Sequence, residues 1–317
     1  MKSCSVGYLA ENQQRPKYYG LHAIRLSEYI IILHAVRHLC VDNCAKAIAA
    51  KTCISKLAKM KIDEAVAVVT GGARGIGFAI TRALLAHRAK KVIFVDVDEE
   101  QGKLAEKDLK DAFGEDHVSF FKCDVTNGAE FQSVVKKISE QNDGINIFCN
   151  NAGVLDNEDW RRMIDINLTA MIHGTMIAID LLDKQKNGHG GVIVNIASLA
   201  GLIPYEFSPV YAASKHGVIG FTRSVVQTSL DKGIRLNLIC PAFVNTRMTT
   251  GITDVAWVKM IQDVGCVTPD LVAKAFLQLV KDDSCNGQAL RVTLQNGIDF
   301  HSFLEVSDLV EIESNHT

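Results

Sequence analysis

The chain has 317 residues, of which 48% are hydrophobic and 22% are charged, a composition typical of a globular protein with one large α/β domain or two small ones. The formal net charge of −2 gives no reason to expect a nucleic acid as partner. Nine cysteines, an odd number without regular spacing, favour reduced thiols and a cytoplasmic location over a disulfide framework.

Residues 1–59 are rich in basic residues and are predicted to be an N-terminal extension that precedes the fold. The stretch 21–57 is compatible with one or two basic amphipathic helices. Organelle targeting is a weak alternative, because arginines are few and acidic residues interrupt the stretch. A metal site is another, but the spacings of its candidate ligands fit no zinc template well. Those ligands would be His34, His38, Cys40 and Cys44.

Neither a signal peptide nor a membrane span is predicted. The first twenty residues lack an apolar core, and the apolar run over 29–36 is too short to cross a bilayer. No metal site is expected in the rest of the chain.

A glycine-rich turn follows the first predicted strand. The continuous apolar run Ala65–Thr70 is typical of a buried parallel strand, and helical apolar spacing covers Phe78–His87. Glycines at such a junction let the backbone approach a pyrophosphate, which the helix N-terminus binds through N–H groups and its positive dipole end. The turn therefore predicts a dinucleotide site that includes Gly71, Arg74, Gly75, Ile76 and Gly77.

The second predicted strand, Lys91–Val95, ends at Asp96, whose carboxylate can accept hydrogen bonds from the adenosine ribose hydroxyls. The same charge repels the 2′-phosphate of NADP. Arg74 is a signal in the opposite direction, because a basic residue in the glycine turn can pair with that phosphate. Since the Asp96 charge would lie next to the phosphate itself, we expect NAD to be the cofactor.

Two further strands bring polar residues to the same edge of the sheet. A strand over 118–123 is followed by Asp124, and a strand over 145–149 is followed by Asn150-Asn-Ala-Gly153. The carboxyl ends of parallel strands meet at one edge, where ligands bind in open α/β folds. The four strand ends therefore indicate one shared ligand site.

The second half of the chain continues the alternation of strands and helices, without repeats or a linker. Helices are predicted over 163–182, 210–230 and 271–280, and strands over 192–197, 234–239 and 289–293. Asn245-Thr246 opens a loop rich in apolar residues. We therefore expect residues 60–304 to form one Rossmann-type, doubly wound α/β domain with a mostly parallel seven-stranded sheet, followed by a tail over 305–317.

Ser198, Tyr211 and Lys215 suggest acid–base chemistry. Tyr211 and Lys215 are four residues apart in a predicted helix, so their side chains leave the same face. A free phenol has a pKa of about 10 and is a poor base at neutral pH, but a neighbouring ammonium lowers that pKa. Ser198 ends the strand before this helix and can hold a substrate oxygen. Tyr-x-x-x-Lys alone is usually a surface pair, so the interpretation depends on the dinucleotide site upstream.

Together these motifs resemble the short-chain dehydrogenase/reductase family over about residues 62–300. The residues that carry the resemblance are Thr70–Gly77, Asn150–Gly153, Asn167, Ser198 and Tyr211-x-x-x-Lys215. Within the family, the segments 198–202, 211–223 and 235–246 are most similar to the NAD-dependent branch that oxidises 15-hydroxyprostaglandins. The segment 151–156 is also similar to insect-type alcohol dehydrogenases.

The resemblance implies catalytic roles for four residues. Tyr211 would be the general base for alcohol oxidation, and Lys215 would lower its pKa and bind the nicotinamide ribose. Ser198 would hold the substrate oxygen, and Asn167 would anchor a water that links Lys215 to solvent. The family also implies a homodimer, in which helices 163–182 and 210–230 pair across a two-fold axis.

The resemblance further implies where the cofactor lies. Asp96 would bind the adenosine ribose, and Asp124 with Val125 the adenine. The central part of the cofactor would lie against Asn151, Ala152 and Gly153, and the nicotinamide carboxamide against Val244 and Thr246.

Some positions depart from the family pattern and argue against prostaglandin itself as substrate. Ser208 stands where the prostaglandin branch has a glutamine that assists binding of the substrate hydroxyl, and the lid over 246–269 is shorter. Ala242 replaces the usual glycine after Pro241. These changes leave the oxidation chemistry in place.

We therefore expect NAD-dependent oxidation of a secondary alcohol on an apolar substrate, such as a 15-hydroxyprostaglandin-like hydroxy lipid. Alternatives are an insect-type alcohol dehydrogenase, an NADPH-dependent carbonyl reductase, and an NAD(H)-binding sensor or scaffold without turnover. The candidate walls of the substrate pocket are Leu155, Ile203, Tyr205, Phe207, Phe243, Met248 and Trp257.

Overall fold

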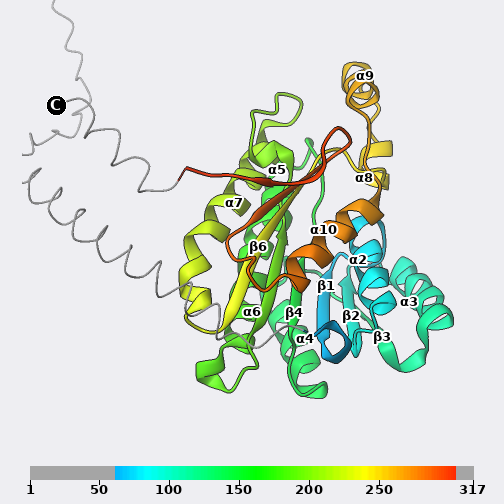
Figure 1. Cartoon of the computed structure of the whole chain (residues 1–317). Helices are drawn as coiled ribbons and strands as arrows, with labels where there is room; N and C mark the ends of the chain where they lie inside the picture. Colours follow the sequence, from blue (N-terminus) through cyan, green and yellow to red (C-terminus); the bar gives the residue numbers. More distant parts are fainter. Residues whose placement is uncertain (1–60, 305–317) are drawn as a thin grey trace, which may run out of the picture. The chain divides into compact units, whose positions relative to one another are not determined.

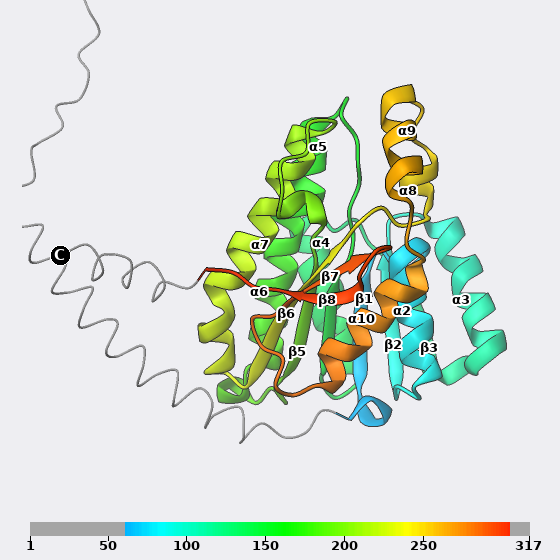
Figure 2. The same ribbon diagram turned by 45° about the horizontal axis from the view of Figure 1, so that its top comes forward.

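The computed structural model describes residues 61–304, and the predictions for residues 1–59 and 305–317 lie outside this range (Figure 1). One eight-stranded sheet has the order β3-β2-β1-β4-β5-β6-β7-β8. Its strands are parallel except β8, which pairs antiparallel with β7. Helices cover both faces of the sheet, which confirms the predicted doubly wound fold class (Figures 1 and 2).

The strands are short and mostly buried, as parallel strands covered on both faces must be. All five residues of β1 and all eight of β6 are buried. The strand bounds are β1 Val66–Thr70, β2 Lys91–Asp96, β3 Val118–Lys122, β4 Ile147–Asn150, β5 Gly191–Ile196, β6 Ile234–Pro241, β7 Ala289–Thr293 and β8 Gly297–His301.

Two layers of helices enclose the sheet because alternate strand residues face opposite sides. One layer contains α2 (Gly75–Ala86), α3 (Glu99–Phe113) and α10 (Pro269–Lys281), whose apolar residues join one core cluster with Ala67 and Val69 of β1. The other layer contains α4 (Gly128–Gln141), α6 (Ala170–Leu182) and α7 (Pro209–Leu230). Val66 and Val68, which alternate with the first pair along β1, face the core cluster beneath α4 and α6.

The order of the strands reverses next to β1. The chain runs from β1 outward to β2 and β3, and then returns to place β4 on the other side of β1. At such a switch point the loops that leave neighbouring strands diverge and open a crevice at the carboxyl edge. The fold therefore places the candidate residues that follow β1, β2, β4, β5 and β6 around this crevice.

A single long helix was predicted over 163–182, but the structure divides this region. Helix α5 (Trp160–Ile164) continues through a five-residue π-helical turn, Asp165–Thr169, into α6. The whole run, Trp160–Leu182, is long and apolar enough by composition to span a membrane, and half of its most apolar window is buried inside the fold. Its apolar composition is therefore consistent with packing against the sheet.

The predicted number of seven strands was wrong, because β8 adds an antiparallel edge strand. The chain reverses after β7 through Leu294–Asn296, and Gly297 has a left-handed φ of +69°. Arg291 and Asp299 then face each other across the two strands and form an ion pair. Asn296-Gly297 is a recognised hairpin signal that the prediction did not use.

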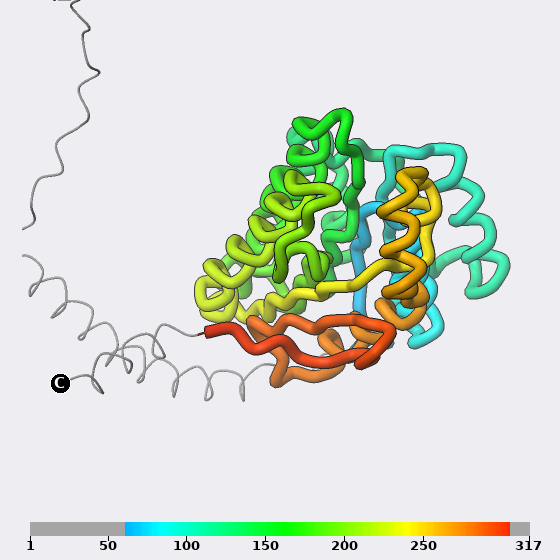
Figure 3. Tube along the Cα trace, turned by 90° about the horizontal axis from the view of Figure 1, so that it is seen from above, coloured from blue at the N-terminus to red at the C-terminus, as the bar shows by residue number. Residues whose placement is uncertain are grey.

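The predicted apolar loop after Thr246 also proved to be partly helical. It contains the short helix α8 (Arg247–Thr250) and the helix α9 (Val255–Val264), whose first turn is capped by Asp254 through a 2.9 Å hydrogen bond from Trp257 N. Figures 2 and 3 show both helices above the carboxyl edge of the sheet, on the side of α2. We call residues 247–264 the lid.

We propose that residues 60–304 are sufficient for folding and activity. Ile62 is the first residue of the described core, and among residues 61–304 the cavity described below is lined from Gly71 onward. A chain that starts at Met60 should bind NADH and turn over at the full-length rate, with a melting temperature lower by no more than about 2–4 °C, which corresponds to roughly 1 kcal/mol. Insolubility or a larger drop, measured by differential scanning calorimetry, would show that residues 1–59 belong to the fold.

Candidate active site

A cavity of about 1280 Å³ lies at the carboxyl edge of the sheet, between the strand ends and the lid. Its walls include every predicted cofactor-binding and catalytic residue except Gly77 and Asn167. One half is lined by the glycine turn and the ends of β2 and β3, and the other by Ser198, Tyr211 and apolar side chains. The crevice predicted from the strand ends is thus a single continuous cavity.

The glycine turn brings bare backbone to the cavity wall. Gly71 and Gly75 have left-handed φ angles of +63° and +57°, which favour glycine. A Cβ on Gly77 would lie 2.2 Å from the Gly71 carbonyl oxygen, so this glycine permits the close packing of α2 against the turn. Arg74 occupies the N-cap of α2 without a side-chain capping bond, and the first turn holds no acidic residue. The N-terminus of α2 therefore fits a pyrophosphate.

Asn151 supports the glycine turn from behind. Its Nδ2 donates hydrogen bonds to the carbonyl oxygens of Thr70 at 2.9 Å and Gly71 at 3.0 Å. The Thr70 hydroxyl accepts in return from the backbone N–H groups of Asn151 and Ala152, each at 3.0 Å. These bonds fasten the end of β4 to the end of β1. The Asn151 amide group positions the turn, and Asn151 also lines the cavity, where its contact with the cofactor stays a prediction.

Asp96 lies at the end of β2 with both carboxylate oxygens fixed. Oδ2 accepts a hydrogen bond from Ala73 N and Oδ1 accepts one from Asp98 N, each at 3.1 Å. Each oxygen retains acceptor capacity on the cavity side, so the carboxylate fits the two hydroxyls of an adenosine ribose. Arg74 was the residue whose charge favoured NADP in the sequence analysis, because it could pair with a 2′-phosphate. In the structure it forms an ion pair with Asp98.

The remaining predicted cofactor residues also line the cavity. Asp124 Oδ1 accepts hydrogen bonds from Thr126 N at 2.9 Å and Thr126 Oγ1 at 2.7 Å, so this carboxylate shapes its own loop beside Val125. Thr246 lies close to the glycine turn, since a Cβ on Gly75 would be 3.2 Å from its methyl group. Gly153, Ala152 and Val244 complete this half of the cavity.

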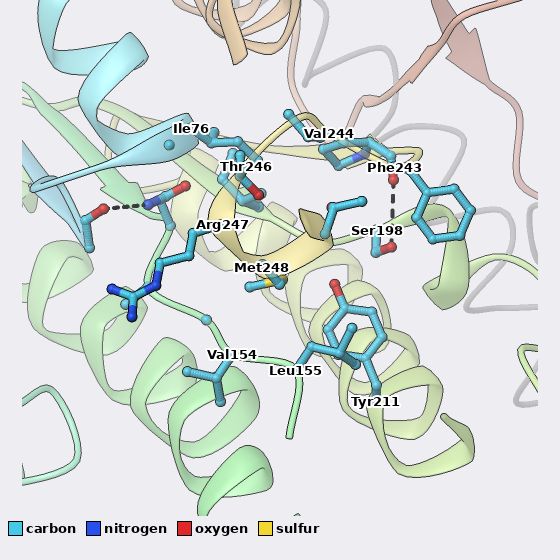
Figure 4. A pocket seen from close by; sticks show the side chains of 18 of the residues that line it. Ile76, Val154, Leu155, Ser198, Tyr211, Phe243, Val244, Thr246, Arg247 and Met248 are labelled. Carbon is cyan, nitrogen blue, oxygen red and sulfur yellow. Dashed lines mark hydrogen bonds between the residues drawn. The ribbon is translucent and has the colours of Figure 1, made fainter. Parts of the chain in front are cut away.

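Ser198 and Tyr211 meet at the boundary between the two halves of the cavity, and in Figure 4 the Tyr211 phenol points toward Ser198. Ser198 Oγ accepts a hydrogen bond from Ala200 N at 3.1 Å and donates one to the Pro241 carbonyl at 3.5 Å. Lys215 leaves α7 on the same face as Tyr211, and its Nζ lies 5.7 Å from the centroid of the phenol ring. The Tyr-x-x-x-Lys spacing thus places both groups in one site.

The electrostatics of this pair differ from the expectation that Lys215 lowers the pKa of Tyr211. Burial raises the pKa of Tyr211, and a hydrogen bond with Ser198 opposes that rise. Burial lowers the pKa of Lys215 from 10.5 to about 8, and its ammonium donates to the Ile196 carbonyl at 3.0 Å. In this structure, desolvation is the largest influence on the pKa of each of the two groups.

Asn167 lies in the π-helical turn, outside the cavity wall, and its side chain is buried. Its Oδ1 accepts from Val154 N at 2.8 Å, and its Nδ2 donates to Val154 O at 2.9 Å. This pair of bonds fixes the segment after β4. A Cβ on Gly153 would lie 3.3 Å from Asn167 Oδ1 and 3.6 Å from Lys215 Nζ, so both side chains approach Gly153. The predicted bridging water stays a prediction.

The other half of the cavity is apolar and aromatic. The Tyr205 ring packs against Tyr211 and Phe243 with centroid distances of 6.4 and 6.3 Å. Trp257, on α9, was predicted to line the cavity, but it does not. It stacks on Phe207 at 5.7 Å and donates a 2.6 Å hydrogen bond from Nε1 to Tyr205 OH, so it fastens the lid to the aromatic wall. The predicted wall residues that do line the cavity are Leu155, Ile203, Tyr205, Phe207, Phe243 and Met248.

Ser208 cannot take the role of the glutamine that it replaces. Its side chain is buried and hydrogen-bonded to Asn157 Oδ1, and it lies outside the cavity wall. Asn157 also donates to the Phe207 carbonyl at 3.1 Å. These bonds secure the start of α7.

Sequence reasoning missed several charged residues of the cavity. Asp98 follows Asp96 by two residues, and Arg247 extends from α8 away from Ser198 and Tyr211 (Figure 4). Arg162 lies on α5, and Arg82 forms an ion pair with Asp270 at 2.6 Å. The presence of Arg74 beside an acid-rich strand end was the one available signal for a pair with Asp98.

Comparisons with known proteins agree with this geometry. The model of the short chain dehydrogenase family matches residues 65–256. An NAD(+)-dependent 15-hydroxyprostaglandin dehydrogenase of Rattus norvegicus is 38% identical over 259 residues, which cover 77% of this chain and 96% of the relative. A 3-oxoacyl-(acyl-carrier-protein) reductase of Chlamydia muridarum is 35% identical over 239 residues, which cover 71% and 94%. The crystal structure of gox2181 superposes with a TM-score of 0.63 at 31% identity, covering 71% of this chain and 92% of that one.

Proposed function

The chain belongs to the short-chain dehydrogenase family, and on this premise we propose that it oxidises a secondary alcohol on an apolar substrate to the ketone, with NAD as cofactor. The observation that carries the proposal is the position of Ser198 and Tyr211, at the junction of a dinucleotide-shaped half and an apolar half of one cavity. A substrate bound in the apolar half would bring its hydroxyl to the phenol, and its carbinol carbon to the dinucleotide half.

The proton chemistry is assigned to residues of this chain. When bound, NAD would supply the acceptor for the hydride that leaves the carbinol carbon. Tyr211 takes the hydroxyl proton, and the Ser198 hydroxyl holds the substrate oxygen during the transfer. The Lys215 ammonium favours the phenolate form of Tyr211 electrostatically. The alcohol loses one hydride and one proton, which leaves the ketone.

The aromatic wall supports an apolar substrate. Tyr205, Phe207 and Phe243 line this half, and burial raises the pKa of the Tyr205 phenol to about 12, so it stays neutral at physiological pH. The name of the rat relative supports a hydroxy lipid resembling a 15-hydroxyprostaglandin. The hydrogen bond between Ser208 and Asn157 argues that the substrate hydroxyl is bound differently from prostaglandin in that branch.

The experiment that tests the proposal is a screen of hydroxy lipids, hydroxysteroids and short secondary alcohols with NAD, followed at the absorbance of NADH. We expect turnover of at least one bulky apolar alcohol and poor turnover of short ones, which cannot fill the aromatic half. NADH binding without turnover of any alcohol would instead favour a sensor or scaffold.

Asp96 is proposed to set a preference for NAD over NADP. Replacing Asp96 by serine removes the charge that would repel a 2′-phosphate, so the ratio of kcat/KM for NAD to that for NADP should fall by roughly tenfold or more. Steady-state kinetics with both cofactors measure this ratio. Asp124→Ser, which removes a carboxylate from another strand end, is the control and should leave the ratio within about twofold. An unchanged ratio in the Asp96 variant would refute this role.

We further propose a homodimer in which α6 and α7 pair with their copies across a two-fold axis. Met176 on α6 is 51% exposed, and burying its apolar side chain in an interface would stabilise the dimer. We expect light scattering at micromolar concentration to give about twice the chain mass, and Met176→Lys to reduce it. A monomeric unchanged protein contradicts the proposal.

We also propose a cytoplasmic location, from the cysteine content of the chain.

A further inference from the structure

Two oppositely charged side chains meet beside the site proposed for the adenosine ribose. Arg74 belongs to the glycine turn, and Asp98 follows β2 by two residues, where it caps α3. Arg74 Nη2 forms an ion pair with Asp98 Oδ2, while Asp98 Oδ1 accepts a hydrogen bond from Gln101 N at 3.0 Å. Each oxygen of Asp98 thus has a different partner, and the guanidinium of Arg74 is directed at this carboxylate.

Two arginines attract the Asp98 carboxylate. Arg247, from α8 of the lid, also attracts the Asp98 carboxylate. The capping bond from Gln101, the hydrogen bond from Arg74 and these attractions hold the pKa of Asp98 below its usual value, so the carboxylate is charged at neutral pH. The side chains of Arg74 and Asp98 are 37% and 40% exposed, and both line the cavity. The pair is therefore accessible to a ligand but partly screened by water.

A 2′-phosphate on the adenosine ribose would bring about 1.5–2 negative charges to this place. Asp96 would repel the phosphate, and its position is fixed by the bonds from Ala73 N and Asp98 N. Arg74 is the natural partner for such a phosphate, since a guanidinium binds phosphate with two parallel hydrogen bonds. To do so, Arg74 would have to leave Asp98, and the Asp98 carboxylate would then face the phosphate without this ion pair.

We propose that Asp98 is a second determinant of cofactor choice, which acts indirectly by holding Arg74 in an ion pair that a 2′-phosphate would have to break. The proposal rests on the proposed use of NAD, and it explains how a basic residue in the glycine turn is compatible with that choice. Asp98 is a positioning residue here, because its effect passes through Arg74.

The test is Asp98→Asn, which removes the charge but keeps a side chain that caps helices equally well. Dissociation constants for NADH and NADPH are measured by fluorescence titration without substrate, alongside kcat/KM for both cofactors. We expect the affinity for NADPH to rise about tenfold, the size of one partly screened charge-assisted hydrogen bond, and the affinity for NADH to stay within about twofold.

A double-variant cycle separates the role of Arg74 from a general change of charge. Arg74→Gln alone should change the affinity for NADPH little, because its guanidinium is already occupied. In the Asp98→Asn background the same change should remove the gain in NADPH affinity. Asp270→Asn is the matched control, because it releases Arg82 from an ion pair on the wall of the same cavity and should leave the ratio of the two affinities unchanged.

The proposal is overturned if Asp98→Asn gives no gain for NADPH, if the gain persists without Arg74, or if Asp270→Asn produces the same gain. Failure of the proposed use of NAD would look different. The unchanged protein would then bind NADPH at least as tightly as NADH, or bind neither.

Discussion

Replacing Tyr211 by phenylalanine is expected to lower kcat for alcohol oxidation by about 10²–10⁴-fold, the usual contribution of a positioned acid or base. The affinity for NADH should stay within about twofold, because the phenol oxygen, not the ring, accepts the proton. The ring keeps its contact with Tyr205, at a centroid distance of 6.4 Å. Stopped-flow or steady-state rates and an NADH titration on the same preparation measure both quantities.

Tyr205→Phe is the matched control for this prediction. It removes a phenol from the neighbouring ring and breaks the 2.6 Å bond from Trp257 Nε1, so it should alter KM more than kcat. Loss of NADH binding in Tyr211→Phe comparable to the loss of rate would contradict the role assigned to Tyr211. So would a similar fall in kcat for Tyr205→Phe.

Replacing Lys215 by methionine should separate catalysis from stability. We expect kcat to fall by about 10²-fold or more, because no cation then favours the phenolate of Tyr211. We also expect the folded protein to become more stable near neutral pH. Burial lowers the pKa of Lys215 from 10.5 to about 8, which corresponds to a destabilisation of about 3 kcal/mol when the amine is charged. The lost hydrogen bond to Ile196 O would offset about 1 kcal/mol of this gain.

The gain in stability from Lys215→Met should depend on pH, because the pKa of Lys215 is lower in the folded protein than in the unfolded chain. The folded-state pKa lies below the unfolded value, so the unfolded chain binds the proton more tightly. The penalty is full below about pH 8, shrinks as the pH rises toward 10.5, and is absent above it. The difference in unfolding free energy between Lys215→Met and the unchanged protein, from urea denaturation, should therefore narrow between pH 8 and 10.

Lys259→Met is the control for the loss of a lysine, since its amine lies on the lid and its side chain is 76% exposed. It should change neither the rate nor the pH dependence of stability. Lys215→Met with normal activity would show that Lys215 is not required for proton transfer. An unfolding free energy that is lower than that of the unchanged protein at pH 7 would show that the hydrogen bond to Ile196 outweighs desolvation.

The elements that the sequence predicted best are those specified by local pattern. The apolar run before Gly71 is typical of a buried strand, and the four-residue spacing of Tyr211 and Lys215 placed both on one face of α7. Such patterns can be read from the sequence because helical and strand periods are properties of neighbouring residues. Candidate residues at successive strand ends came together for a similar reason, since parallel strands share one carboxyl edge.

The π-helical turn, β8 and α9 were missed for two reasons. The π-helical turn at Asp165–Thr169 leaves the apolar helical pattern almost unchanged, so periodicity does not reveal it. Strand β8 and helix α9 are short, and their apolar residues gain burial only against partners elsewhere in the chain. Asp254 before α9 and Gly297 at the start of β8 were local signals, but each residue type is common in loops as well.

Local sequence patterns specified the fold class and most of the candidate residues that line the cavity, because parallel strands share one carboxyl edge and the residues that follow them meet there. Tertiary structure alone decided what those side chains do there. It directs the Asn151 amide to the glycine turn, joins Arg74 to Asp98, fastens Trp257 to Tyr205 across 52 residues, and buries Lys215 enough to lower its pKa. Hydrogen-bond partners and desolvation depend on atoms brought together from distant parts of the chain, and no spacing in the sequence encodes them.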